Sequence, residues 1–255
     1  MNTDLTPRIT IMPNAERLAR NCAAFFCRTA VESVARNGRF HVALSGGSTP
    51  RPMHRLLATP PYLTDIPWAH THIYWADERL VTEDDPASNF GAAKKDLLDR
   101  LPIQKEHIHP MVSPRPPSEA AADYERLLAK SFGTDPPKLP IFDCIFLGIG
   151  QDGHTASIFP GDRTAVDTTR WVVAVNGGSP NVDRLTLTLA VLRQARCIVF
   201  LVTGSDKAET VQTILEQDRE TLPPQWLASN DNQVFWFLDQ DAARLLTGDT
   251  FRNEA

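Results

Sequence analysis

The segment FDCIFLGIGQDGH, residues 142–154, contains the features that decide the fold and point to a site. Its first part, 142–147, is a short and largely apolar run of the kind that forms a buried strand of a parallel sheet. Three glycines, an aspartate and a histidine follow directly. Because ligands of open α/β sheets bind outside the carboxyl ends of the strands, the segment predicts a central parallel strand that leads into a functional loop.

Strand-like and helix-like stretches alternate through the rest of the chain. Further strands are expected at residues 8–12, 41–44, 72–75, 171–175, 185–189, 198–202 and 234–238. Helices are expected from Asn14 to about Asn37, up to Leu57, from Ser88 to about Asp99, over 118–132 and from Ser205 to about Gln217. This alternation predicts one α/β domain over residues 1–255, with a mostly parallel sheet flanked by helices.

The composition is that of an ordinary globular protein. The hydrophobic fraction of 42% and the charged fraction of 22% exclude a disordered or fibrous chain, and 255 residues are enough to bury a substantial core. With 26 Lys+Arg against 31 Asp+Glu, the formal charge of −5 argues against nucleic acid or an anionic membrane as a partner. A small anionic ligand remains open, but it requires cations that gather locally.

The chain has the character of a reduced, cytoplasmic protein. Its four cysteines are scattered and show no C-x-x-C spacing, so they predict free thiols rather than a disulfide scaffold. The first residues, MNTDLTPRITIMPN, have no apolar core of a signal peptide, and no stretch approaches the ~18 apolar residues of a membrane helix. We therefore expect neither secretion nor membrane insertion.

The turn SGGSTP at 45–50 is a candidate phosphate cradle. Gly46 and Gly47 let the backbone turn tightly and expose successive N–H groups, while Ser48 and Thr49 add hydroxyl groups. The turn is not a Walker A loop, because G-K-[ST] is absent. It is not a nucleophile elbow either, because no glycine lies two residues before Ser45. An ordinary strand-to-helix turn is the alternative.

Other loops supply candidate cations. The motif WADER at 75–79 places Asp77 and Arg79 at a strand end, where a guanidinium can form a forked contact with phosphate or carboxylate. Lys207 lies in the first turn of an expected helix, where it opposes the helix dipole, and an anion held between them would explain it. Arg184 begins a strand and is a third candidate. A surface ion-pair cluster and a solvated lysine are the alternatives for Arg79 and Lys207.

The loop GIGQDGHTASIFPG at 148–161 carries the candidate acid–base residue. Its first six residues match G-x-G-x-x-G, but Pro160-Gly161 interrupts the long helix that dinucleotide binding needs, so we reject that interpretation. The glycines are expected instead to form a close-packed loop that presents Asp152 and His154. Histidine side chains titrate near neutrality, which suits a general base. A structural histidine is the alternative.

Two further pairs of histidines, His70/His72 and His107/His109, have H-x-H spacing and are candidate metal ligands. Spacing by two places each pair on one face of a strand, which can build a metal site. No third ligand has a recognisable spacing, so we expect surface roles and no metal site.

Together these loops resemble the 6-phosphogluconolactonases of the glucosamine-6-phosphate isomerase/6-phosphogluconolactonase family. The resemblance extends from about Phe40 to Leu238, with its motifs in the family order. They are LSGGSTP at 44–50, WADER at 75–79, SNFG at 88–91, GIGQDGHTASIFPG at 148–161, RLTLT at 184–188 and TGSDKA at 203–208. It implies the Rossmann-like fold shared with glucosamine-6-phosphate deaminase and ribose-5-phosphate isomerase.

The deaminases of this family are the main alternative, and two positions distinguish them. Their motif G-H-I-A-F-N-E-P has a glutamate five residues after the histidine, where this chain has Phe159, and a tyrosine follows their D-E pair, where this chain has Arg79. Isomerisation with amine loss needs several acid–base groups, whereas lactone hydrolysis needs one base and a water. A non-catalytic sugar-phosphate sensor is a third reading, but only about forty residues precede the LSGG turn, and they fit one strand and one helix rather than a helix-turn-helix segment.

The resemblance implies hydrolysis of 6-phospho-D-glucono-1,5-lactone in the oxidative pentose phosphate pathway. His154 would be the general base and Asp152 its support. The substrate and its phosphate would be held by Gly46, Gly47, Ser48, Thr49, Asp77, Arg79, Arg184 and Lys207. No metal or organic cofactor is implied, and we expect a monomer or a small homo-oligomer.

Overall fold

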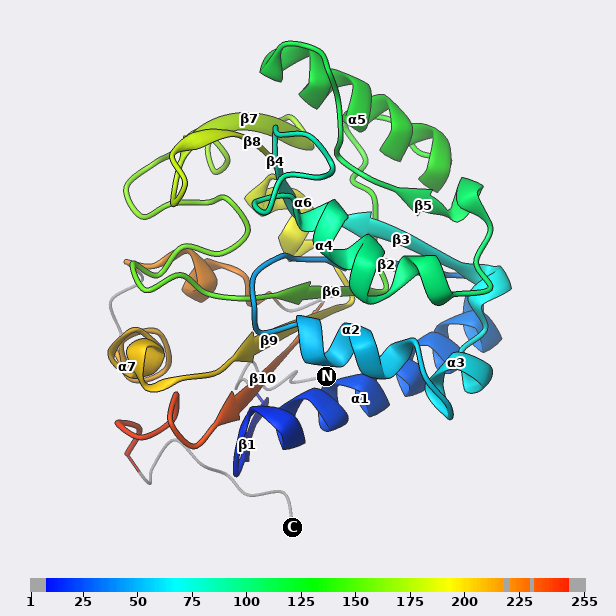
Figure 1. Cartoon of the computed structure of the whole chain (residues 1–255). Helices are drawn as coiled ribbons and strands as arrows, with labels where there is room; N and C mark the ends of the chain where they lie inside the picture. The colour runs from blue at the N-terminus through cyan, green and yellow to red at the C-terminus, as the bar shows by residue number, and fades with distance from the viewer. Residues whose placement is uncertain (1–7, 218–220, 230–231, 248–255) are drawn as a thin grey trace.

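A seven-stranded sheet, parallel throughout, forms the centre of the protein in the computed structural model, which describes residues 8–217, 221–229 and 232–247 (Figure 1). The strand order is β1-β10-β9-β6-β2-β3-β5. The strands are β1 (Arg8–Met12), β2 (Phe40–Leu44), β3 (Thr71–Trp75), β5 (Ile108–His109), β6 (Cys144–Leu147), β9 (Cys197–Val202) and β10 (Gln233–Asp239). The predicted mostly parallel sheet is confirmed.

The strand order reverses once, between β2 and β6. From β2 the chain adds β3 and then β5 on one side, and it returns to place β6, β9 and β10 on the other. Loops that leave β2 and β6 therefore diverge and open a crevice at the carboxyl edge of the sheet, which is where ligands bind in such folds. The turn at 45–50 and the loop at 148–161 begin at this point.

A second, antiparallel sheet of three strands, which the sequence did not predict, stands beside the first (Figure 1). Its order is β4 (Asp77–Arg79), β8 (Val182–Leu187) and β7 (Val172–Gly177). The DER segment, expected as the loop after a strand, is thus itself a strand. The strand expected at 185–189 begins earlier and ends at Leu187, because Leu187 is the last residue paired with β7.

The five predicted helices are present, with ends that differ by a few residues, and the structure adds two short helices, α3 (Tyr62–Asp65) and α6 (Leu189–Arg193), that the sequence did not predict. The predicted five are α1 (Ala15–Asn37), α2 (Arg51–Leu57), α4 (Asn89–Asp96), α5 (Pro117–Phe132) and α7 (Ala208–Glu216). The Asn14 side chain accepts the Arg17 N–H to begin α1, and Gly38 ends it with a φ of 77°. The helix expected to reach Asp99 ends at Asp96, and a 3-10 turn precedes α7.

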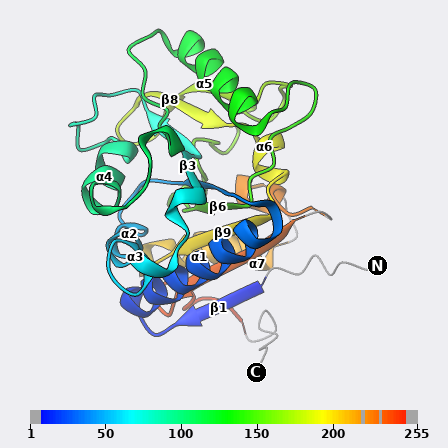
Figure 2. The same ribbon diagram turned by 90° about the vertical axis from the view of Figure 1, so that its right-hand side faces the viewer.

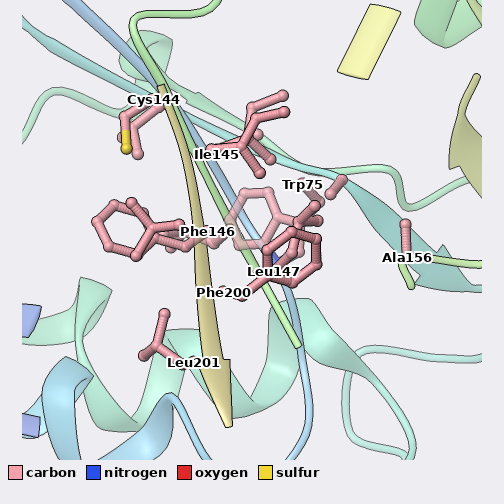
Figure 3. Packing of buried hydrophobic residues seen from close by; sticks show 14 of the residues in the cluster. Trp75, Cys144, Ile145, Phe146, Leu147, Ala156, Phe200 and Leu201 are labelled. Carbon is pink, nitrogen blue, oxygen red and sulfur yellow. The ribbon is translucent and has the colours of Figure 1, made fainter. Parts of the chain in front are cut away.

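The core lies on both faces of β6 and β9, whose residues are almost all fully buried. Figure 2 shows α1 lying across one face of the sheet, where Phe26 stacks on Phe146 with ring centroids 5.6 Å apart. Figure 3 shows Cys144 and Phe146 on one side of β6 and Ile145 on the other. The predicted buried central strand is confirmed, although it begins at Cys144 rather than Phe142.

The described residues also bear on the remaining expectations. The four cysteines are free, as predicted. No helix in the described ranges has the length and apolar character needed to cross a membrane. The predicted single domain over 1–255 stays a prediction, and residues 1–7, on which part of the expectation of no leader rests, lie outside the described residues.

Candidate active site

A cleft at the carboxyl ends of β2, β6 and β9 brings together most of the predicted site residues. It is lined by Ser45, Gly46, Gly47, Ser48, Thr49, Pro50, Asp77, Arg79, Asn89, Gly148, Ile149, His154, Ala156, Arg184, Leu201, Val202, Thr203 and Lys207. Of the predicted set only Asp152 lies outside this lining, and it contacts His154 directly. The four loops singled out in the sequence thus converge on one cavity.

The turn at 45–50 forms one wall of the cleft. Gly47 has a φ of 90°, a left-handed conformation that favours glycine. Gly46 lies against Asn89, and a Cβ there would stand only 1.7 Å from the Asn89 Oδ1 atom. The Thr49 hydroxyl lies 3.1 Å from that of Thr203, which joins the turn to the loop after β9. The turn therefore packs closely against Asn89 on one side and is joined to the loop after β9 on the other.

Hydrogen bonds to residues at the start of α4 hold the Arg79 guanidinium in place. Its Nη1 atom donates to the Ala87 carbonyl and to the Asn89 Oδ1 atom, each at 2.7 Å. The Asn89 amide in turn donates to the Asp77 carbonyl at 2.9 Å. Asn89 lines the cleft, although the sequence analysis assigned it no role. Asn89 lies in the SNFG motif at 88–91, which supported the family resemblance but did not indicate what this side chain contacts.

Arg184 stands in the wall of the cleft as a fixed cation. Its side chain is only 2% exposed, its Nε donates to the Gly177 carbonyl at 2.7 Å, and its Nη2 donates to the Pro180 carbonyl at 3.2 Å. Burial, together with the positive charge of Arg79, lowers the pKa of Arg184 from its ordinary value. The guanidinium supplies charge to the cleft, while most of its hydrogen bonds go to the β7–β8 hairpin.

Asp77 is buried between two partners. Its Oδ2 atom accepts the Ser157 hydroxyl at 2.7 Å and lies 3.9 Å from Nη1 of Arg184. Ser157 is a second residue that sequence reasoning missed, because it lies 80 positions after Asp77 and no local pattern indicates the contact. The carboxylate balances part of the positive charge on this side of the cleft.

His154 and Asp152 form a pair at the mouth of the cleft. The His154 Nδ1 lies 2.6 Å from the Asp152 Oδ1, which also accepts the His154 backbone N–H at 3.2 Å. Burial acts to raise the pKa of Asp152, but the His154 N–H and side chain outweigh it and hold that pKa below its usual range. With Nδ1 facing a carboxylate, Nε2 is the ring nitrogen left with a lone pair.

Lys207 also lines the cleft, at the end of the 3-10 turn before α7. Its ammonium lies 3.6 Å from Asp206, whose carboxylate accepts the Gln151 amide at 2.8 Å. That hydrogen bond lowers the pKa of Asp206. Gln151 thereby connects the loop that carries His154 to the loop that carries Lys207.

The H-x-H pairs lie away from this cleft. His72 and His109 join His41 and His107 in a ring stack at the amino ends of β2 and β3, with 3.2 Å between Nδ1 of His72 and Nε2 of His109. His70 is exposed. Among residues 8–217, 221–229 and 232–247, no three His, Cys, Asp or Glu side chains are grouped to hold a metal.

The fold and the cleft together define a class: a Rossmann-like α/β protein that gathers basic side chains and a histidine–aspartate pair around a glycine turn. The family model described as glucosamine-6-phosphate isomerases/6-phosphogluconolactonase matches residues 13–236. The chain therefore belongs to this family, as the sequence motifs indicated.

Individual relatives agree. A 6-phosphogluconolactonase of Synechocystis is 34% identical over 245 residues, which cover 95% of this chain and 99% of the relative. The 6-phosphogluconolactonase of Rattus norvegicus is 36% identical over 244 residues, which cover 94% of this chain and 93% of the relative. The solved structure of 6-phosphogluconolactonase from Trypanosoma cruzi superposes with a TM-score of 0.84 at 28% identity, covering 96% of this chain and 98% of that one.

Proposed function

We propose that the protein hydrolyses 6-phospho-D-glucono-1,5-lactone to 6-phospho-D-gluconate. One observation carries this proposal: a histidine whose Nδ1 is engaged by Asp152 lines the same cleft as Lys207, Arg79 and Arg184. A phosphate at the cationic end of the cleft would orient the sugar with its lactone carbonyl toward His154. Relatives that bear this name match nearly the whole chain, which supports the same reaction.

The chemistry requires one base and one water. His154 Nε2 removes a proton from water as the oxygen attacks C1 of the lactone, and the carbonyl π electrons move to the carbonyl oxygen. Collapse of this tetrahedral species breaks the bond between C1 and the ring oxygen, which takes the proton from the imidazolium. General acid–base catalysis of this kind supplies about 10²–10⁴ in rate.

The remaining residues hold the substrate and the base. Asp152 fixes the His154 tautomer and stabilises the imidazolium that forms. The turn from Gly46 to Thr49, together with Arg79 and Lys207, binds the phosphate, while Arg184 adds positive charge from the wall. Asp77 cannot approach a dianion without repulsion, so we assign it to a sugar hydroxyl and to holding Arg184. Binding energy gained at the phosphate positions C1 against the water.

Phe159 argues against the deaminase alternative. Its ring lies 5.0 Å from that of His154, between centroids, and 5.8 Å from the Arg184 guanidinium carbon. An aromatic ring thus occupies the position where the deaminase motif has a glutamate, and no acid–base group replaces that carboxylate there. A non-catalytic sugar-phosphate binder would need the cleft but not the His154–Asp152 pair.

A direct assay separates these functions. The lactone is generated with glucose-6-phosphate dehydrogenase, and acid release is followed against the spontaneous rate, with glucosamine 6-phosphate and ammonia detection in parallel. We expect hydrolysis well above the spontaneous rate, no ammonia, and the same activity after dialysis against a chelator. Ammonia release would support a deaminase, and neither activity would support a binder. The cytoplasmic location, the pathway and the oligomeric state stay predictions.

A further inference from the structure

A buried acidic side chain, that of Glu78, lies next in sequence to the cleft-lining residues Asp77 and Arg79, and the reaction described above does not use it. Glu78 is the middle residue of β4 and is 1% exposed. Its Oε1 atom accepts the backbone N–H groups of Arg79 at 2.7 Å and Asn89 at 2.8 Å, and its Oε2 atom accepts that of Phe90 at 2.6 Å. A buried carboxylate with three backbone donors is a specific arrangement.

Two of those donors belong to the beginning of α4. The first N–H groups of a helix have no partner within the helix. Here Glu78 accepts those of Asn89 and Phe90, while the Ser88 hydroxyl accepts that of Gly91 at 3.0 Å. A carboxylate is also favoured at the positive end of the helix dipole. Glu78 therefore ties the start of α4 to β4.

The start of α4 contacts the substrate-binding groups through one side chain. Asn89, its first residue, accepts from Nη1 of Arg79 and donates to the Asp77 carbonyl. The same side chain packs so closely on Gly46 that a Cβ would not fit there. A shift of this helix end would move the Asn89 contact on Arg79 and the support of the glycine turn together.

We propose that Glu78 is a positioning residue, which fixes Arg79 and the glycine turn for substrate binding by holding the start of α4 against β4. This inference rests on the proposed function, in which those two features bind the phosphate. Because Arg79 and the glycine turn are assigned to the phosphate and His154 to the chemical step, Glu78 controls substrate affinity more than the chemical step.

The charge state of Glu78 gives this role a pH dependence. Burial raises the pKa of Glu78 to about 7, while the N–H groups of Phe90, Asn89 and Arg79 oppose the increase and the neighbouring Asp77 adds to it. The other groups that interact with its charge are Arg184 on β8 and Tyr124 on α5. Protonation removes an acceptor from the helix end, so affinity falls as the pH drops below about 7.

The test is steady-state kinetics of Glu78→Gln with the phosphorylated lactone. The glutamine is isosteric, but its NH₂ group meets an N–H donor, so we expect KM to rise about tenfold with kcat within about threefold of wild type. Glu83→Gln is the matched control, because Glu83 pairs with Lys94 of the same helix on the surface. Equal KM values for Glu78→Gln and wild type would overturn the inference.

The pH profile and a double variant distinguish positioning from a structural role. The titration of the substrate phosphate affects wild type and variant alike. Compared with wild type, Glu78→Gln should therefore lose only the change of log KM near pH 7 that comes from Glu78 itself. In an Arg79→Ala background, Glu78→Gln should raise KM by a smaller factor than in the wild-type background, because the part of its effect that passes through Arg79 is already lost. Full additivity, or an unchanged pH profile, would contradict the proposal.

A further variant keeps the inference testable if Glu78→Gln does not fold. Asn89→Ala leaves the buried carboxylate with its backbone donors and removes the side chain that contacts Arg79, the Asp77 carbonyl and Gly46, so KM should still rise severalfold. An unchanged KM would refute the proposed link from Glu78 to the phosphate-binding groups. Failure of the proposed function is distinguishable, because wild type would then show no hydrolysis above the spontaneous rate, whatever residue occupies position 78.

Discussion

Gly150 matters because of the space it leaves for the base. A Cβ at this position would stand 2.1 Å from Nδ1 of His154 and 2.3 Å from Oδ1 of Asp152. We expect Gly150→Ala to displace the pair and to lower kcat about tenfold or more, which is part of the ~10²–10⁴ that a general base supplies. Steady-state kinetics with circular dichroism as a folding control measure this, and an unchanged kcat in a folded variant would refute the assigned geometry.

Lys207 is the cation with the fewest protein contacts around the cleft among those assigned to the phosphate. Among the residues that the structure describes, its ammonium has one carboxylate at ion-pair distance, that of Asp206 at 3.6 Å, so most of its charge is available to a ligand. Lys207→Ala should raise KM for the phosphorylated lactone by about tenfold or more, since hydrogen bonds to charged groups contribute ~1.5–3 kcal/mol. Lys105→Ala, at an exposed position, is the control. Equal KM values for the two variants would remove Lys207 from the phosphate site.

At the scale of secondary-structure elements, the histidine stack makes the strand ends sensitive to acid. Burial lowers the pKa of His41 to about 3 and those of His72 and His109 to about 4, with neighbouring histidines adding to the effect. In the unfolded chain these groups titrate near 6.5. Between about pH 6.5 and 4 the unfolded chain therefore binds more protons, and the free energy of unfolding falls as the pH drops.

Urea denaturation at pH 7.5 and pH 5 tests this expectation. His72→Phe should reduce the loss of stability between the two pH values, and His70→Phe, which changes the exposed member of the same H-x-H pair, should not. Glu78 acts in the opposite direction, because its raised pKa makes the folded state bind more protons below pH 7. It is present in every variant, so the comparison cancels it. An identical pH dependence in His72→Phe and wild type would contradict the role of the stack.

The sequence predicts the large sheet better than the small one, for a physical reason. Strands such as β6 and β9 are apolar runs, so the residues of each strand are enough to predict that it is buried. In contrast, β4 is the charged triplet DER, which is a strand only because it pairs with β8. The same holds for the site. The glycine turn and His154 have local signals, whereas Glu78, Asn89 and Ser157 act through contacts between segments.

At the scale of the whole molecule, local charge decides how an anion approaches. The chain carries a formal charge of −5, yet Arg79, Arg184 and Lys207 line one cleft. We expect kcat/KM for the phosphorylated lactone to fall as ionic strength rises, because salt weakens the attraction between exposed charges at separations beyond the Debye length of ~8–10 Å. Glucono-1,5-lactone, which lacks the phosphate, is the control and should show a flatter dependence. An increase of kcat/KM with salt would mean that the net negative charge dominates the approach.

His154→Ala removes the side chain that we propose activates the water that opens the lactone. Enzymatic hydrolysis above the spontaneous rate should fall by about 100-fold or more, since a general base contributes ~10²–10⁴. Calorimetric binding of 6-phosphogluconate should stay within about threefold of wild type, because the phosphate contacts remain. Turnover near the wild-type rate in the folded variant would show that His154 is not the general base.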